Sequence, residues 1–246
     1  MPSQTPVEPS GKSGVRPMSR ESSARRQKLG GLLVCKQRWG LSWRGWLALI
    51  VVGLTGVISL LVFIRPFLAV TDRVDSDVLV VEGWIDQSTA PVAVTEFKTH
   101  SDRQVFTTGG PVKGVGTNFN DYHTLASVGA GLLIDAGMPR DCVQMVPCHE
   151  SGGHDRTYNS ALALKRWFKE HNLQVRRFNL LTEDAHARRS RLLFQEAFGD
   201  TAEVGVISVP DPDYDPARWW KNSEGVRVII GESIAYIYAR FFFHPA

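Results

Sequence analysis

The longest uninterrupted apolar stretch of the chain lies near its N-terminus. Residues 46–64 contain no charged side chain, and Arg44 and Arg65 bracket them. About 20 apolar residues cross the hydrocarbon core of a bilayer as a helix, whereas a helix in a soluble core would carry a polar stripe. A cleaved signal peptide is the rival interpretation, but the preceding basic region is long and no A-x-A site follows. The pattern predicts one uncleaved membrane anchor over residues 45–66.

Beyond the anchor, short apolar runs alternate with amphipathic segments. The run over residues 77–81 is typical of a strand buried on both faces. Further strands are predicted over residues 104–107, 143–147, 178–181 and 204–209, and helices over residues 91–100, 121–136, 157–171 and 186–198. This alternation predicts a three-layer α/β/α, Rossmann-like domain with a mainly parallel five-stranded sheet over residues 71–246.

The last apolar segment covers residues 227–243. Glu232 and Arg240 interrupt it, and the uncharged stretch between them is too short for a second membrane span. We expect a helix that docks on the domain. Its end, at residues 241–243, is expected either to pack on the domain or to touch the membrane surface.

The net charge of +3 is distributed unevenly along the chain. Residues 1–44 hold nine Lys/Arg and two Glu, whereas residues 71–246 hold 18 Lys/Arg against 23 Asp/Glu, a net charge of −5. Because basic flanks stay cytoplasmic, we predict a cytoplasmic N-terminus, a single pass through the inner (plasma) membrane and an extracytoplasmic or periplasmic domain. The tail, poor in large apolar residues, is predicted to be disordered. The acidic domain argues against nucleic acid as a partner.

Two cysteines flank one predicted strand. Cys142 and Cys148 are six positions apart, so an extended chain would separate their Cα atoms by about 20 Å. A disulfide needs roughly 4.4–6.8 Å. We predict two partly buried thiols that are not bonded to each other. No Cys/His spacing typical of zinc occurs, and no metal is assigned.

Polar motifs stand where predicted strands end. They are Glu82-Gly83-Trp84, Thr108-Gly109-Gly110, Asp155-Arg156-Thr157-Tyr158-Asn159 and the segment from Thr182 to Arg189. The carboxyl ends of parallel strands line one crevice, and ligands bind there. We therefore expect these motifs, scattered over a hundred residues, to meet in one site.

Three residues supply the chemistry of an anion site. Arg156 and His186 are predicted to begin helices, whose N-termini attract anions, and Arg189 adds a planar donor fork for phosphate or carboxylate. His186 faces the same way as Arg189 and is a candidate catalytic acid or base. Glu82 is the second catalytic candidate, with a salt bridge to Arg156 as the conservative alternative.

The remaining candidates have structural alternatives. Thr157 is either a helix cap or a ligand contact, and Asn159 either ties loops together or contacts the ligand. Glycines permit close backbone approach. The predicted ligand-binding residues are Gly83, Gly109, Gly110, Arg156, Thr157, Asn159 and Arg189.

In order and spacing, these motifs resemble the DUF218 family, also called the ElyC/SanA/YdcF family. The similarity extends over residues 75–240 and includes Trp219-Trp220 and Glu232. It implies a Rossmann-like fold, a cell-envelope setting and a link to peptidoglycan and lipid-carrier homeostasis. Binding of S-adenosylmethionine has been suggested for some members. Tyr158 departs from the pattern, because many members have Glu at this position.

These observations leave three functional hypotheses. The first is a membrane-anchored envelope protein that binds an anionic, phosphate-bearing small molecule or a lipid-linked envelope precursor, with hydrolysis or transfer at the phosphate as its enzymatic version. The second is a non-catalytic binding or scaffold module. The third is a nucleotide-binding or S-adenosylmethionine-binding domain, although the G-x-G-x-x-G and P-loop patterns are missing. The cofactor is unknown.

The charge asymmetry generates a topology prediction. A reporter that works only outside the cytoplasm, fused after Ala246, should be active, because the basic flank keeps the N-terminus inside. A reporter that works only in the cytoplasm, fused at the same position, should be inactive. Activity solely from that cytoplasmic reporter would contradict the predicted orientation.

Overall fold

The computed structural model describes residues 41–100, 103–112, 124–149 and 156–245, together with two short strands, β1 (Gln27–Lys28) and β2 (Leu33–Val34), which pair antiparallel. The chain divides into two units, Met1–Val51 and Val52–Ala246. The rest of the predicted tail up to residue 40, and Asp155 of the third motif, lie outside the described residues.

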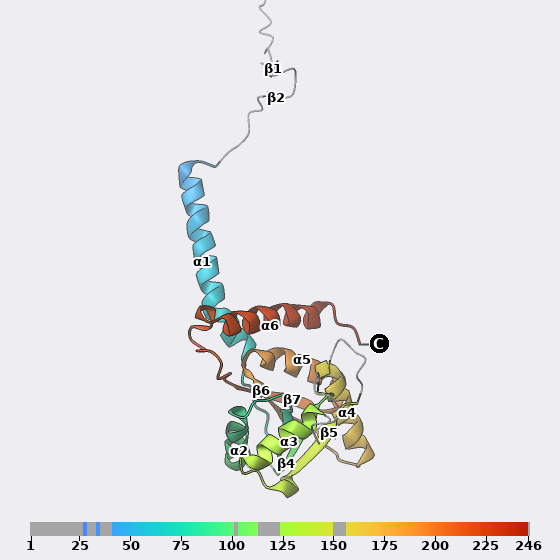
Figure 1. The fold of residues 1–246 in the computed structure, drawn as a ribbon. Helices are drawn as coiled ribbons and strands as arrows, with labels where there is room; N and C mark the ends of the chain where they lie inside the picture. The colour runs from blue at the N-terminus through green and yellow to red at the C-terminus, as the bar shows by residue number, and fades with distance from the viewer. Residues whose placement is uncertain are drawn as a thin grey trace, which may run out of the picture. The chain divides into compact units, whose positions relative to one another are not determined.

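Five parallel strands form the central sheet of the second unit (Figure 1). They are β3 (Val78–Glu82), β4 (Gln104–Gly109), β5 (Val143–Pro147), β6 (Arg177–Glu183) and β7 (Glu203–Val209). Their order is β5-β4-β3-β6-β7, and all neighbours are parallel. The predicted α/β sheet is confirmed. After β3 the chain adds β4 and β5 on one side and then β6 and β7 on the other. Ligands of α/β sheets bind in the crevice at such a switch point, which lies here between β3 and β6.

Helices cover both faces of the sheet. Helices α2 (Thr89–Thr99) and α3 (Leu125–Asp135) pack on one face, and α4 (Arg156–Glu170) and α5 (Ala187–Phe198) pack on the other. Strand β3 serves both layers: Val78 and Val80 face α4 and α5, and Leu79 and Val81 face α2 and α3. Its continuous apolar run follows from this double burial.

The helix boundaries differ slightly from the sequence pattern. Helix α3 begins later than expected, at Leu125, because Thr124 is its N-cap and accepts a hydrogen bond from the Ser127 amide. In α2, Val94 is buried, whereas Val92 is 44% exposed. The short 3₁₀ turns are η1 (Arg140–Cys142), η2 (Asp184–His186), η3 (Gly199–Thr201) and η4 (Trp219–Lys221).

The cysteines lie on either side of β5. Cys142 is partly exposed and ends η1, and Cys148 is buried just after the strand. An extended strand separates the two sulfurs, so these thiols are not joined to each other.

Helix α1 (Trp43–Leu68) has 26 residues and is long and apolar enough to cross a membrane. It ends two residues later than the predicted anchor, and its last turns belong to the domain. Leu68 is fully buried, and Leu61 and Ile64 pack against the cluster that contains Trp219. The indole N–H of Trp219 donates to the Leu61 carbonyl at 3.0 Å.

The sequence assigned Arg65 only to the flank of the anchor, but the structure gives it a buried partner. Its Nε donates to Asp184 Oδ2 at 3.2 Å, and Nη2 forms an ion pair with Oδ1. Asp184 is 1% exposed and also accepts a hydrogen bond from the Tyr214 hydroxyl. Burial and this contact raise the pKa of Tyr214. Asp184 has a φ of 35°, which is uncommon for a residue other than glycine; these contacts hold it there.

Helix α6 (Ser223–Phe241) completes the fold on the outer side of α5 (Figure 1). Asn222 caps its start by accepting from the Glu224 amide at 2.8 Å. Ile229 is buried in the cluster with Leu68 and Trp219. Phe243, beyond its end, packs edge-on against Tyr158 of α4 at 5.0 Å.

Close packing of α3 on the end of β3 generates a stability prediction. A Cβ on Gly129 would lie 2.6 Å from the Gly83 Cα, so Gly129→Ala must push α3 away. Such overpacking typically costs about 1–3 kcal/mol. Gly231→Ala is the control, because a Cβ there meets nothing within 4 Å and helical Ala is favoured over Gly. Chemical unfolding in detergent should show a loss for the first variant and none for the second; equal stability would contradict the proposed packing.

Candidate functional site

A cavity of about 250 Å³ opens at the carboxyl edge of the sheet, beside the switch point. Its walls come from the ends of β3 and β4 and from the first turns of α4 and α5. Of the nine predicted site residues, seven line it: Glu82, Gly109, Gly110, Arg156, Thr157, His186 and Arg189. The polar motifs therefore converge as the sequence predicted.

Two predicted ligand-binding residues do not border this cavity. A Cβ on Gly83 would lie 2.2 Å from the Leu125 carbonyl oxygen, so this glycine allows α3 to approach β3. Asn159 is half-buried in the first turn of α4. Its neighbour Tyr158 packs on Phe243, so this side chain serves packing.

Glu232 of α6 forms the electrostatic centre behind the cavity. The Arg189 guanidinium donates to both of its oxygens, Nε to Oε2 at 2.7 Å and Nη2 to Oε1 at 3.0 Å. His186 Nδ1 lies 3.0 Å from Oε1. Glu232 is only 7% exposed. Burial alone would raise its pKa, but the hydrogen bonds from His186 and Arg189 outweigh burial and lower the pKa to about 2.

This ion cluster gives Arg189 a partner that the sequence did not assign. Arg189 was expected to grip a ligand; Glu232 accepts from its Nε and Nη2, and Nη1 lies 3.5 Å from the Thr157 hydroxyl at the cavity wall. His186 Nδ1 also lies 3.2 Å from Arg189 Nη2. We assign Nδ1 as a donor to Glu232, because the carboxylate is charged and closer. The ring is thereby oriented, and Nε2 is the nitrogen that remains for proton transfer.

Among the described residues, Glu82 pairs with a serine and not with Arg156, the partner in its alternative interpretation. It is 3% exposed, and its Oε2 accepts a hydrogen bond from the Ser190 hydroxyl at 2.7 Å. Within the described part of the chain, it forms no ion pair with Arg156. Arg156 is exposed at the first residue of α4 and lines the cavity.

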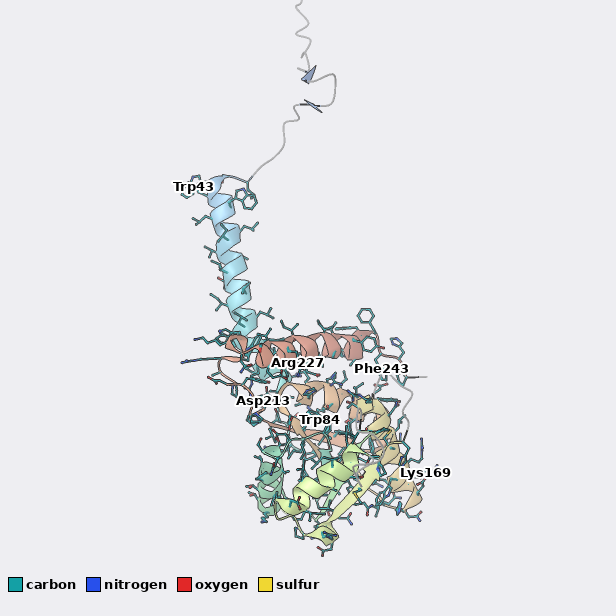
Figure 2. The ribbon with its side chains drawn as sticks, viewed as in Figure 1. Trp43, Trp84, Lys169, Asp213, Arg227 and Phe243 are labelled. Atoms are coloured by element: carbon teal, nitrogen blue, oxygen red, sulfur yellow. The ribbon has the colours of Figure 1, made fainter. Side chains whose placement is uncertain are left out.

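Two further residues shape the cavity, although the sequence assigned them no role. The hydroxyl of Thr108 is buried and has no hydrogen-bond partner among the described residues. Such a group usually finds a partner, and Thr108 borders the cavity. Trp84, labelled in Figure 2, stacks at a tilt on His186 with ring centroids 4.5 Å apart. Both residues lie in the motifs at the predicted strand ends, so this position in the sequence could have identified them as cavity residues.

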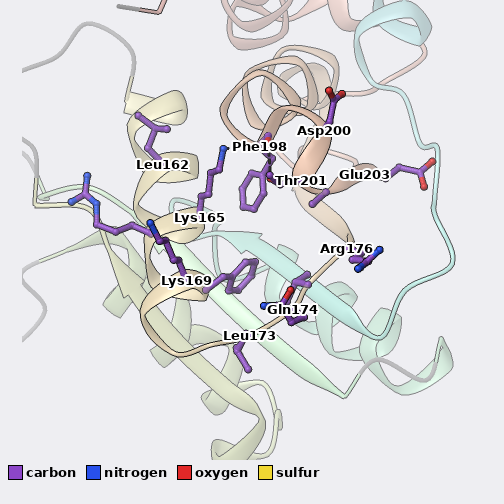
Figure 3. A pocket seen from close by; sticks show the side chains of 14 residues that line it. Leu162, Lys165, Lys169, Leu173, Gln174, Arg176, Phe198, Asp200, Thr201 and Glu203 are labelled. Carbon is purple, nitrogen blue, oxygen red and sulfur yellow. Dashed lines mark hydrogen bonds between the residues drawn. The ribbon is translucent and has the colours of Figure 1, made fainter.

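A larger cavity, about 940 Å³, lies at the opposite edge of the sheet (Figure 3). It borders the residues that precede β6 and β7, including Arg176 and Ala202. Lys165, one of the cations that line it, donates to the carbonyls of Ala197 and Phe198 at the end of α5. Lys165 thus caps a helix. We favour the smaller cavity as the site, because it holds the converging motifs and a buried hydroxyl without a partner in the described chain.

No protein-family model and no curated protein matches this chain. The resemblance to the DUF218 family therefore rests on the motifs quoted above.

The ion cluster of Glu232, His186 and Arg189 generates a prediction about how stability depends on pH. Glu232→Gln should lower the free energy of unfolding at pH 7 by about 1–3 kcal/mol, because it weakens the charge-assisted hydrogen bonds to Arg189. The pKa of Glu232 is lowered from 4.5 to about 2, so its stabilisation is complete above about pH 4.5 and is lost as the pH falls towards 2. The difference between wild type and variant should shrink over that window in denaturant titrations.

Glu224→Gln is the matched control on the same helix. Glu224 pairs with Arg227 one turn away on the surface, so this variant should keep wild-type stability. A Glu232→Gln protein as stable as wild type at pH 7 would contradict the role of the cluster.

Proposed function

We propose that this chain is a membrane-anchored cell-envelope protein whose cavity binds the phosphate group of an anionic ligand, either a phosphate-bearing metabolite or a lipid-linked envelope precursor. The observation that carries the proposal is the buried Thr108 hydroxyl, which borders the same cavity as Arg156 and lacks a partner in the described chain. The resemblance to the DUF218 family and the link to peptidoglycan and lipid-carrier homeostasis belong to the same proposal.

The electrostatics of the cavity favour an anionic group. Helix α5 begins after His186 without a side-chain cap. His186 and Arg189 line the cavity, as do Arg156 and Thr157 at the start of α4, and helix N-termini favour negative charge. Glu232 neutralises Arg189, so Arg156 is the cation at this edge that pairs with no carboxylate of the described chain. The backbone of Gly109 and Gly110 borders the same space.

The membrane anchor favours a ligand at the membrane. Helix α1 runs into the domain without a linker, and Arg65 and Leu68 fix its end there. We place the domain on the extracytoplasmic side of the inner membrane, as the basic tail predicts. A lipid-linked head group would then be within reach of the cavity.

The proposal has a catalytic version and a version in which the cavity binds its ligand without a reaction. Glu82 and His186 both line the cavity, and either is suited to proton transfer during hydrolysis or transfer at the phosphate. The non-catalytic alternative is favoured by one observation: His186 and Arg189 are both engaged by Glu232. The cavity of about 250 Å³ suits a phosphate group better than an entire nucleotide or S-adenosylmethionine.

Calorimetry on the full-length protein in mild detergent tests the proposal. It measures the binding of farnesyl phosphate and of inorganic phosphate. Arg156→Gln should weaken binding by about tenfold or more, because it removes a charge-assisted contact. Arg166→Gln is the control, with the same change on the same helix at the other cavity. Binding of farnesyl phosphate alone would indicate a lipid-linked ligand. Binding of S-adenosylmethionine in place of both phosphates would overturn the proposal.

Thr108→Val gives a second, independent readout. The substitution keeps the shape of a buried side chain and removes a hydroxyl that has no partner in the described structure, so stability should be unchanged or higher. Phosphate binding should weaken. Phosphate release from farnesyl phosphate by wild type, lost in His186→Gln with binding intact, would identify the catalytic version.

A further inference from the structure

Helix α6 has an inner and an outer face of different character. Ile229, Glu232 and Ala239 are buried on the inner face. The outer face is apolar, and its residues recur at helical spacing. We call it the outer stripe: Ile230, Ile234, Ile237, Tyr238, Phe241 and the adjoining Phe242, which are 48% to 68% exposed.

The charges around the outer stripe are mainly basic. Arg227 and Arg240 are exposed near the two ends of the helix, and Arg227 also pairs with Glu224. The acidic residue in the middle, Glu232, points inward to Arg189. An apolar face flanked by arginines is typical of helices that lie in the interface of a membrane.

The outer stripe begins where the candidate membrane span meets the domain. Phe67 of α1 packs edge-on against Tyr236 at 5.4 Å, and Ile229 shares a cluster with Leu68. At the other end, Phe243 packs on Tyr158 of α4. Helix α6 therefore crosses the domain and does not follow α1; Figure 2 labels Arg227 and Phe243 near its two ends.

We infer that α6 is an interfacial membrane helix, whose outer stripe enters the boundary between lipid head groups and acyl chains. The argument for lipid is continuity: Phe63 and Phe67 of α1 are 66% and 43% exposed, and their apolar surface meets α6 through Tyr236. Exposed aromatic residues at this level, including Trp220 and Tyr238, are typical of membrane interfaces. A second copy of the chain is the rival occupant.

This inference has a consequence for the cavity and rests on the membrane anchor of the proposed function. The outer stripe would face lipid while Glu232, on the inner face, holds His186 and Arg189 at the cavity wall. The cavity would then lie about one helix diameter, roughly 10 Å, from the lipid surface.

Photo-crosslinking of the full-length protein in phosphatidylethanolamine–phosphatidylglycerol vesicles tests the inference. Benzoylphenylalanine replaces Ile234 of the outer stripe, Ile58 of α1 as the anchor control, or Val92 of α2 as an exposed apolar control. Thermal unfolding checks that each variant is folded. Mass spectrometry should find lipid adducts at positions 58 and 234 and none at position 92.

The outcomes separate the two proposals. An adduct at position 58 without one at position 234 overturns the interfacial helix and leaves the anchor intact. A cross-link from position 234 to a second copy, without lipid adducts, assigns the stripe to a dimer and overturns the inference. Absence of adducts at both positions overturns the anchor and the interfacial helix together, whereas phosphate binding is measured independently of either.

Discussion

The buried carboxylate of Glu232 is the interaction on which the arrangement around the cavity depends. An ionised group that is 7% exposed must be compensated, because a buried charge left without its partner destabilises the fold. The compensating groups, His186 and Arg189, come from the start of α5. The last helix of the chain is therefore fixed against the wall of the cavity, and the same contact orients the imidazole of His186.

A second buried carboxylate lies two residues before His186. Asp184 binds Arg65 from the end of α1 and Tyr214 from the segment after β7, and its carbonyl accepts a hydrogen bond from the Ser208 hydroxyl at 3.0 Å. The end of β6 thus connects in one direction to the candidate membrane span and in the other to the cavity. Movement of the span relative to the sheet would have to break a buried ion pair, so the cavity is held at a defined place relative to the end of α1.

These pairings change the chemistry of the site. With Arg189 neutralised by Glu232, the cavity does not have two arginines to clamp a dianion. It offers Arg156, the amides at helix starts and the Thr108 hydroxyl, beside the apolar wall of Trp84. Such a combination suits one phosphate group attached to an apolar or bulky remainder, which agrees with a ligand drawn from the membrane surface.

The sequence by itself determined the alternation of strands and helices, the long apolar helix and the convergence of seven candidate residues at one edge. Local periodicity carries this information, because a strand buried on both faces must be largely apolar, as in residues 78–81, and parallel strands must share a carboxyl edge. Only the tertiary structure decided the partners. Arg189 meets Glu232 across 43 residues, and Arg65 meets Asp184 across 119. Gly83 proved to be a packing residue because α3 passes directly over it. Charge pairing and close approach depend on which surfaces come together after the helices pack, and no local pattern records that.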